Sequence, residues 1–130
     1  MERGVKAYFD GQYSLAEKDL LEVTRRVPND GMAWFRLGNL YMRQNQLDRA
    51  ADAYQKALVR QSGLDKAWHN LGVVQIMLAQ RHFQQLRTRL PATSPLQERA
   101  GYFEQGIDAL LTRPPAMAGQ ATANDEQVSD

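Results

Sequence analysis

The sequence predicts an all-α protein built from stacked helical hairpins, and three observations carry this prediction. The stretch "AWFRLGNLYMRQ" begins at Ala33, and "AWHNLGVVQIML" begins 34 residues later at Ala67, so that Ala, Trp, Leu and Gly return at the same offsets. Within both stretches apolar residues recur at three- and four-residue steps, which is the period of an amphipathic helix. The two tryptophans of the chain, Trp34 and Trp68, occupy the same point of this period. A fixed period of this length is typical of helical repeat proteins.

Length and composition are those of one compact globular domain. The chain has 130 residues, a formal net charge of +1 and no cysteine. The near-neutral charge predicts no strong attraction to nucleic acid or to acidic membranes, and without cysteine there is neither a disulfide framework nor thiolate chemistry. No apolar run approaches the about 18 residues of a membrane span. We therefore expect no direct membrane insertion, and both the cytoplasm and the bacterial periplasm stay open as compartments.

The first repeat, at about residues 1–30, is truncated at its start. Met1 falls on the fifth position of the period, so the first helix lacks its opening turn. Either an upstream segment such as a signal or anchor region has been removed, which we favour, or the first helix is short. The second helix of this repeat is indicated by apolar residues in register with the next repeat, among them Ala16, Leu20 and Val23.

The second repeat, residues 31–64, is the most regular. Its first helix carries one apolar stripe, which breaks at the polar stretch "RQNQ" at residues 43–46. A second stripe follows: Leu47, Ala50, Ala51, Tyr54, Ala57 and Leu58. Because Ala50 and Ala57 are small, they can face Gly38 across a tight helix pair, with Tyr54 filling the gap beside them. Two helices joined by a short polar turn predict an antiparallel hairpin.

The third repeat, residues 65–112, contains an insertion near 80–96. One alternative is a long helix from about Asp65 to about Arg89, and the other is a turn near Gln80 followed by a short extra helix. The stretch "PATSP" then forms a loop in which Thr93 or Ser94 can cap a last amphipathic helix at roughly 96–112. In that helix "YFEQGI" is similar to "AYQKAL" at residues 53–58. Residues 113–130 have no periodicity and are predicted to be a disordered tail.

The second repeat carries the pattern W-x2-LG-x2-Y…A-x3-Y-x2-A. Its residues are Trp34, Leu37, Gly38, Tyr41, Ala50, Tyr54 and Ala57. This pattern resembles the tetratricopeptide repeat family, over about residues 1–79 in all. It departs from the family at Ser62, where proline is usual, although Pro28 stands at the matching place of the first repeat. The resemblance implies a right-handed superhelical stack of about three hairpins with an irregular C-terminal capping helix, in which each tryptophan seals the space between one hairpin and the previous one.

A concave groove lined by the first helix of each hairpin is the predicted binding site. Its residues are Phe35, Arg36, Asn39, Met42, Arg43, Lys66, His69, Asn70, Val73 and Met77. Exposed methionines and aromatics beside arginine are typical of interfaces. The resemblance implies that this face binds an extended peptide or helix of a partner protein, here neutral to acidic, with Asn39 and Asn70 at positions that often hydrogen-bond the peptide backbone. Because Phe35 stands where a clamp lysine would, we predict no carboxylate clamp.

Other functions receive less support from the sequence. The alternative is self-association, in which the groove packs on a second copy of the chain as a homodimer or on a missing repeat. His69 and His82 lie in different helical segments with no acid or second histidine at metal-binding spacing. We therefore expect no catalytic site, and with it no metal, cofactor or small-molecule substrate. Because the net charge is near zero, we also expect no nucleic acid as a partner. Four arginines near the insertion form a local basic patch, which we interpret as a solvated surface. The family is frequent in bacterial assemblies such as pilus or secretion systems, and we expect such a setting.

Overall fold

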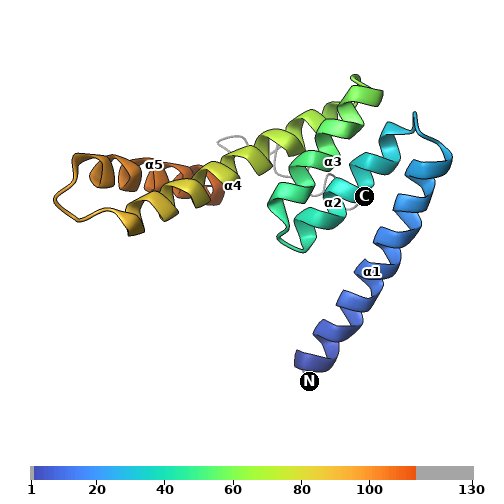
Figure 1. Cartoon of the computed structure of the whole chain (residues 1–130), viewed down its shortest axis with the longest axis horizontal. Helices are drawn as coiled ribbons and strands as arrows, with labels where there is room; N and C mark the ends of the chain where they lie inside the picture. Colours follow the sequence, from blue (N-terminus) through green and yellow to red (C-terminus); the bar gives the residue numbers. More distant parts are fainter. Residues whose placement is uncertain (1, 114–130) are drawn as a thin grey trace. The chain divides into compact units, whose positions relative to one another are not determined.

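The computed structural model describes residues 2–113, with side chains for residues 11–113, and its regular elements over that range are all helices. The helices are α1 (Glu2–Arg26), α2 (Gly31–Arg43), α3 (Leu47–Arg60), α4 (Asp65–Arg89) and α5 (Pro95–Thr112) (Figure 1). The predicted all-α class is confirmed. The predicted tail lies outside the described residues from position 114 onward.

The described chain divides into two compact units, residues 2–71 and 72–113. The first unit holds α1, α2, α3 and the first turns of α4, and the second holds the rest of α4 together with α5. The residues that carry the repeat pattern of residues 31–64 therefore all lie in the first unit.

α2 and α3 form the hairpin that the sequence predicts for residues 31–64. Asp30 caps the start of α2, because its carboxylate accepts hydrogen bonds from the backbone N–H of Met32 at 3.0 Å and of Ala33 at 3.4 Å. The turn between the helices places Asn45 at a φ of 58°, a left-handed conformation that asparagine adopts more readily than most residues. The chain therefore reverses at the polar stretch identified in the sequence.

The core of the first unit lies between the facing stripes of α2 and α3. Leu37, Ala50, Tyr54 and Ala57 have no measurable exposure to solvent. The Tyr54 ring lies directly against Gly38, where an added Cβ would collide with three ring atoms. The predicted close approach at Gly38, with Tyr54 filling the gap, is confirmed. Glycine lowers helix propensity at this position, and the packing of a large buried ring offsets that cost.

α1 packs on α2, but it is one continuous helix rather than a hairpin. Residue 11 lies 34 positions before Asn45, so the repeat register would place a turn at Gly11, yet α1 continues through it. A turn there would leave residues 2–10 as a very short helix, which is marginal in water. Continuation instead keeps the backbone hydrogen bonds. The first unit therefore contains one complete hairpin, α2–α3, preceded by a single helix.

A partly buried hydrogen bond joins α1 to α2. The hydroxyl of Tyr41 donates to the Glu17 carboxylate at 2.7 Å, and the guanidinium of Arg49 lies 3.8 Å from the same carboxylate. Burial of Tyr41, together with the hydrogen bond and the negative charge of Glu17, raises the pKa of the Tyr41 hydroxyl from 10.0 to about 12. The folded state therefore favours the neutral phenol.

α4 settles the choice between the two arrangements predicted for the third repeat. It runs without interruption from Asp65 to Arg89, so the long helix is the correct alternative. The residue at the register position of Asn45 is Ala79, which has no preference for the left-handed conformation, and no Gly or Pro follows before Pro91. The chain therefore lacks a turn signal where α2 has one.

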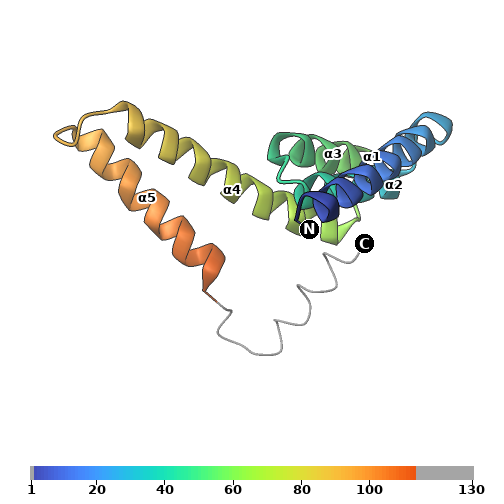
Figure 2. The same ribbon diagram turned by 90° about the horizontal axis from the view of Figure 1, so that it is seen from below.

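α5 runs back from the end of α4 and contacts it in the second unit (Figure 2). The rings of Phe83 and Phe103 are stacked with centroids 4.9 Å apart, and Nε of Arg87 lies 2.8 Å from the Glu104 carboxylate. Ser94 occupies the N-cap position, but its side chain makes no capping hydrogen bond. The last predicted helix is confirmed within one residue at its start.

The two tryptophans have different surroundings, which corrects the expectation that each seals a space between hairpins. Nζ of Lys56 lies 4.7 Å from the Trp34 ring centroid and Cζ of Arg60 lies 5.3 Å from it, so Trp34 is covered by α3 of its own hairpin. Trp68 is 55% exposed, and its indole N–H donates to the backbone carbonyl of Ser62 at 2.9 Å. Residues 81–94, which align with α3, belong to α4 and the loop after it, so no equivalent helix forms in register.

Gly38 and Gly72 occupy the same repeat position, so alanine at each makes a matched pair. We predict that Gly38→Ala lowers the free energy of unfolding by about 1–3 kcal/mol, because the added methyl overlaps the Tyr54 ring. Gly72→Ala, with nothing within 4 Å of its Cβ, is expected to raise it by up to about 1 kcal/mol through helix propensity. Urea unfolding followed by circular dichroism measures both. Equal changes of the same sign would contradict this account of Gly38.

Alkaline pH should weaken the α1–α2 contact. Because the folded-state pKa of Tyr41 is raised to about 12, the stability contributed by its neutral hydroxyl is complete below pH 10 and is lost as the pH rises towards 12. We predict that the stability difference between the native chain and Tyr41→Phe shrinks across this interval. Chemical unfolding at a series of pH values measures that difference. A difference that stays constant from neutral pH to pH 12 would refute the role of this hydroxyl.

Candidate functional site

Three predicted groove residues lie in the interior, which corrects the expectation that they are exposed. Phe35, Asn39 and Asn70 are 2%, 5% and 6% exposed. The Phe35 ring centroid lies 5.9 Å from that of Tyr54. Because α2 and α3 approach closely at Gly38, the α2 side chains that flank this glycine are enclosed by the same contact. Helical spacing placed these residues on one face of α2 but did not show how far a neighbouring helix covers it.

Asn39, Tyr54 and Asn70 form a buried hydrogen-bond network within the first unit. The side-chain carbonyl of Asn39 accepts from the Tyr54 hydroxyl and, at 3.0 Å, from the amide of Asn70. The Asn70 amide also lies 3.5 Å from the Tyr54 hydroxyl. Burial raises the pKa of Tyr54 above its ordinary value, so the hydroxyl stays protonated and able to donate. One residue from each of α2, α3 and α4 thereby meets at a single point.

One donor of this network has no partner. Nδ2 of Asn39 is buried, and no residue of the described chain accepts a hydrogen bond from it. A buried unsatisfied amide costs about 1–3 kcal/mol. The Asn39 carbonyl, which accepts twice, therefore carries the function of this side chain in the fold.

The remaining predicted residues of the first unit lie at the surface. Arg36 and Arg43 are exposed on α2, and Met42 beside them is half-buried. On α4, Lys66 and His69 are exposed, and Nδ1 of His69 lies 3.1 Å from the Asn70 side-chain carbonyl. We call these five residues the α2–α4 face. Its two helices are joined beneath the surface by the hydrogen bond between Asn39 and Asn70.

Val73 and Met77 belong to the second unit. Both are half-buried and follow Lys66 and Asn70 along α4 at three- and four-residue steps. Both are apolar, whereas Lys66 and Asn70, which precede them on this side of α4, are polar. This position on α4 is all that the structure establishes for them.

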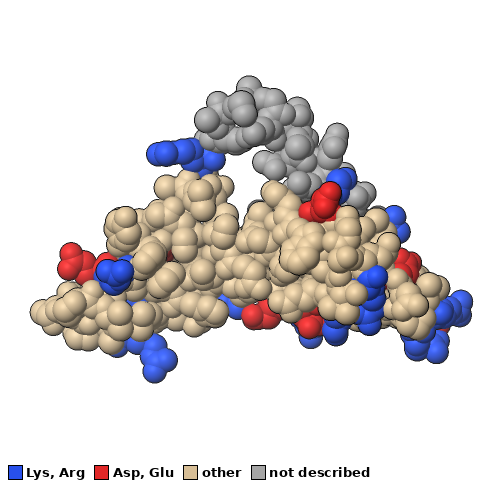
Figure 3. Space-filling model, turned by 90° about the horizontal axis from the view of Figure 1, so that it is seen from above, with Lys and Arg blue, Asp and Glu red and all other residues tan. Residues whose placement is uncertain are grey.

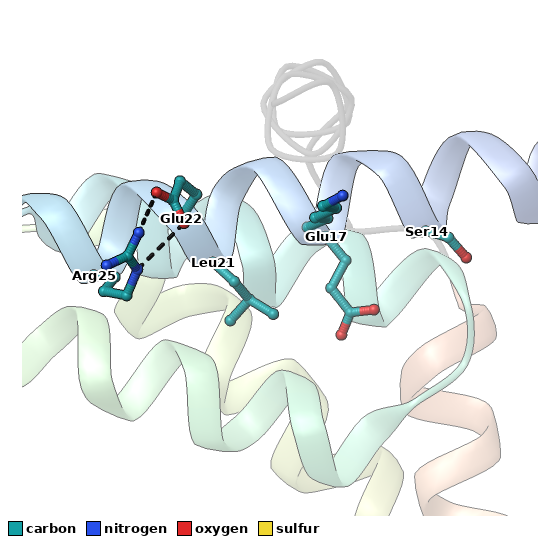
Figure 4. Close-up of a pocket in the computed structure, with 6 residues that line it drawn as sticks. Ser14, Glu17, Leu21, Glu22 and Arg25 are labelled. Atoms are coloured by element: carbon teal, nitrogen blue, oxygen red, sulfur yellow. Dashed lines mark hydrogen bonds and ion pairs between the residues drawn. The ribbon is translucent and has the colours of Figure 1, made fainter.

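A shallow depression on α1 was not anticipated from the sequence. It is lined by Ser14, Glu17, Lys18, Leu21, Glu22 and Arg25. Figure 4 shows Glu22 and Arg25 paired in it, and Glu22 also accepts from Nε of Arg26 at 2.9 Å. All six residues come from one helix, which cannot enclose a small molecule. No signal in the sequence distinguishes this stretch from an ordinary solvated helix surface.

Charged residues of both signs occur on one face of the molecule. On the face seen in Figure 3, Lys and Arg alternate with Asp and Glu among mostly uncharged residues. Among the described side chains, those of residues 11–113, no three His, Cys, Asp or Glu residues lie close enough together to hold a metal ion. No helix in the same part of the chain is long and apolar enough to cross a membrane.

Comparison with known proteins adds one match. A family model described as "Tetratricopeptide repeat" matches residues 1–66, just over half of the chain. The matched region covers α1, α2, α3 and the start of α4, and it includes Asn39 and Tyr54 but not Asn70. No curated protein matches the chain.

Substitution of the network residues should be destabilising and non-additive. We predict that Asn39→Ala lowers the free energy of unfolding by about 1–3 kcal/mol, because the Tyr54 hydroxyl and the Asn70 amide both lose their acceptor. Adding Tyr54→Phe to Asn39→Ala should then cost less than Tyr54→Phe alone. Urea unfolding of the double-mutant cycle measures this coupling.

Gln55→Ala is the control for this cycle, since Gln55 is exposed on α3 outside the network and its replacement should change stability by less than about 0.5 kcal/mol. Strict additivity of the two network substitutions would show that the hydrogen bonds contribute nothing jointly.

Proposed function

Because the chain belongs to the tetratricopeptide repeat family, we propose that it is a scaffold that binds a segment of a partner protein on the α2–α4 face. Tetratricopeptide repeats generally mediate protein–protein interaction and are typically non-catalytic. Protein–protein interaction as the general function therefore follows from membership of the family. The face, the ligand and the setting are the parts that we propose here.

The observation that carries this proposal is the fixed pairing of α2 and α4 beneath the face. The 3.0 Å hydrogen bond between Asn39 and Asn70 holds the two helices together before any ligand arrives. A surface that is already ordered loses less conformational entropy on binding than a mobile one. Both asparagines thus support binding from below, and neither is exposed to contact the ligand directly.

The side chains of the face indicate the chemistry of the ligand. Arg36, Arg43 and Lys66 are exposed cations, and arginine can bind a carboxylate through two parallel hydrogen bonds. Met42 offers an adaptable apolar contact beside them. We propose a neutral to acidic peptide or helix as the ligand. A bacterial assembly such as a pilus or secretion system is the setting we propose for it.

Reversing the charge of Arg36 and Arg43 should weaken peptide binding without unfolding the protein. A peptide library selected on the full chain should yield acidic sequences of roughly micromolar affinity, about −8 kcal/mol. We predict that the Arg36→Glu/Arg43→Glu variant binds a selected peptide at least about tenfold more weakly by fluorescence anisotropy, and that added salt weakens binding to the native chain.

Arg26→Glu is the control, because Arg26 is an exposed arginine on α1 that pairs with Glu22, away from the face. It should bind the peptide as the native chain does. Equal losses in both variants, or a loss that follows a lower melting temperature, would rule out this face as the binding site.

A further inference from the structure

His69 differs from the other residues of the α2–α4 face because its ring is bonded to the buried network. Nδ1 of His69 lies 3.1 Å from the side-chain carbonyl of Asn70. His69 is exposed, whereas Asn70 is only 6% exposed. The other ring nitrogen, Nε2, makes no hydrogen bond within the described chain. Nε2 is therefore the nitrogen that a ligand on this face can contact.

The contact with Asn70 determines which nitrogen of neutral His69 carries the proton. A neutral imidazole has one N–H donor, and its other nitrogen is an acceptor. Because a carbonyl oxygen can only accept, Nδ1 must be the donor in the 3.1 Å contact. Nε2 then holds a free lone pair. An unconstrained histidine in water mostly carries its proton on Nε2, so the Asn70 contact reverses the hydrogen-bonding character of the outer nitrogen.

The buried network in turn fixes the orientation of the Asn70 amide. The NH2 group of Asn70 donates to the Asn39 carbonyl at 3.0 Å, so its own carbonyl is directed to His69. Turning the Asn70 amide alone would place two carbonyl oxygens against each other. Turning both amides would take the Asn39 acceptor away from the Tyr54 hydroxyl and leave that hydroxyl an acceptor 3.5 Å away, which is beyond hydrogen-bonding distance for O–H···O.

Nε2 of His69 is the one strong acceptor among the side chains of the α2–α4 face. Arg36, Arg43 and Lys66 carry N–H groups that can only donate, and the sulfur of Met42 is a weak acceptor. A bound peptide backbone offers carbonyl oxygens, which the three cations can bind. It also offers N–H groups, and on this face only Nε2 can accept a strong hydrogen bond from one of them.

We propose that Asn70 holds neutral His69 in the Nδ1–H tautomer, and that Nε2 accepts a hydrogen bond from a backbone N–H of the peptide bound on the α2–α4 face. This inference rests on the function proposed above and adds a requirement for its ligand. The peptide must present an N–H group to His69 beside the groups that the arginines bind. Proline has no backbone N–H, so it is excluded from that position of the ligand.

The tautomer is tested on the full chain without a ligand. Two-bond nitrogen–proton NMR correlations at mildly alkaline pH, where histidine side chains are neutral, identify the protonated nitrogen of each ring. We expect Nδ1–H for His69 and Nε2–H for His82, an exposed histidine of α4 without a hydrogen bond in the described chain. In Asn70→Ala, His69 should adopt the pattern of His82, whereas Gln55→Ala should leave it unchanged.

The native spectrum alone decides the first half of the proposal if Asn70→Ala does not fold. His69 that shows the same tautomer as His82 overturns it, because the network would then have the opposite polarity. A folded Asn70→Ala variant in which His69 keeps the Nδ1–H form overturns the role of Asn70. Circular dichroism checks the fold, and His82→Gln assigns the signals of the two rings.

The ligand contact is tested with a peptide selected on the full chain. His69→Leu removes the acceptor, and His69→Gln supplies a side-chain carbonyl in its place. We expect the dissociation constant to rise at least about fivefold in His69→Leu and less in His69→Gln. Replacing the peptide amides by esters, one position at a time, removes single N–H groups. One ester should weaken binding to the native chain about fivefold and cause no further loss in His69→Leu.

These measurements separate the contact at His69 from the proposed function. Binding that is lost in Arg36→Glu/Arg43→Glu, but is unchanged in His69→Leu and by every ester, overturns the contact and leaves the proposed function standing. Binding that does not depend on the arginines overturns the proposed function and the ligand contact together. The NMR result still decides the tautomer in that case, because it is obtained without a ligand.

Discussion

The packing of Tyr54 against Gly38 is the contact on which the first unit depends. The ring enters the space left by the missing side chain of Gly38, and the hydroxyl on the same ring reaches the carbonyl of Asn39. Asn39 in turn accepts from Asn70, so one side chain of α3 links the apolar hairpin core to α4. Hydrophobic burial provides the larger share of this stabilisation, and the hydrogen bonds fix which residues meet.

This arrangement gives the asparagines a structural role that precedes any role in binding. An amide exposed in a groove can hydrogen-bond a ligand, whereas the side chains of Asn39 and Asn70 hydrogen-bond each other and Asn39 also accepts from Tyr54. The binding that we propose on the α2–α4 face above them therefore relies on charge and on adaptable side chains. Such a surface is more sensitive to salt than one that hydrogen-bonds a peptide backbone.

Most of the fold could be predicted from the sequence, because the 34-residue period is visible in residues that pack the helices together. The α2–α3 hairpin, the contact at Gly38 and the last helix were all found in this way. The exposure of Asn39 and of Trp68 could not be predicted, since periodicity gives the side of a helix and not whether another helix covers it. The long α4 was one of two open alternatives, because the absence of a turn residue is a weaker signal than its presence.

The contrast between Asn45 and Ala79 bears on what makes the chain reverse at one point of the repeat. Both residues occupy the same point of the repeat, and the chain reverses at one and continues as a helix at the other. Gly11 occupies this point as well and α1 continues through it, so a residue that tolerates left-handed backbone permits the turn but does not by itself produce it. A complete hairpin therefore needs more than its turn residue, because α2 and α3 also carry the facing apolar stripes that bury Tyr54 against Gly38.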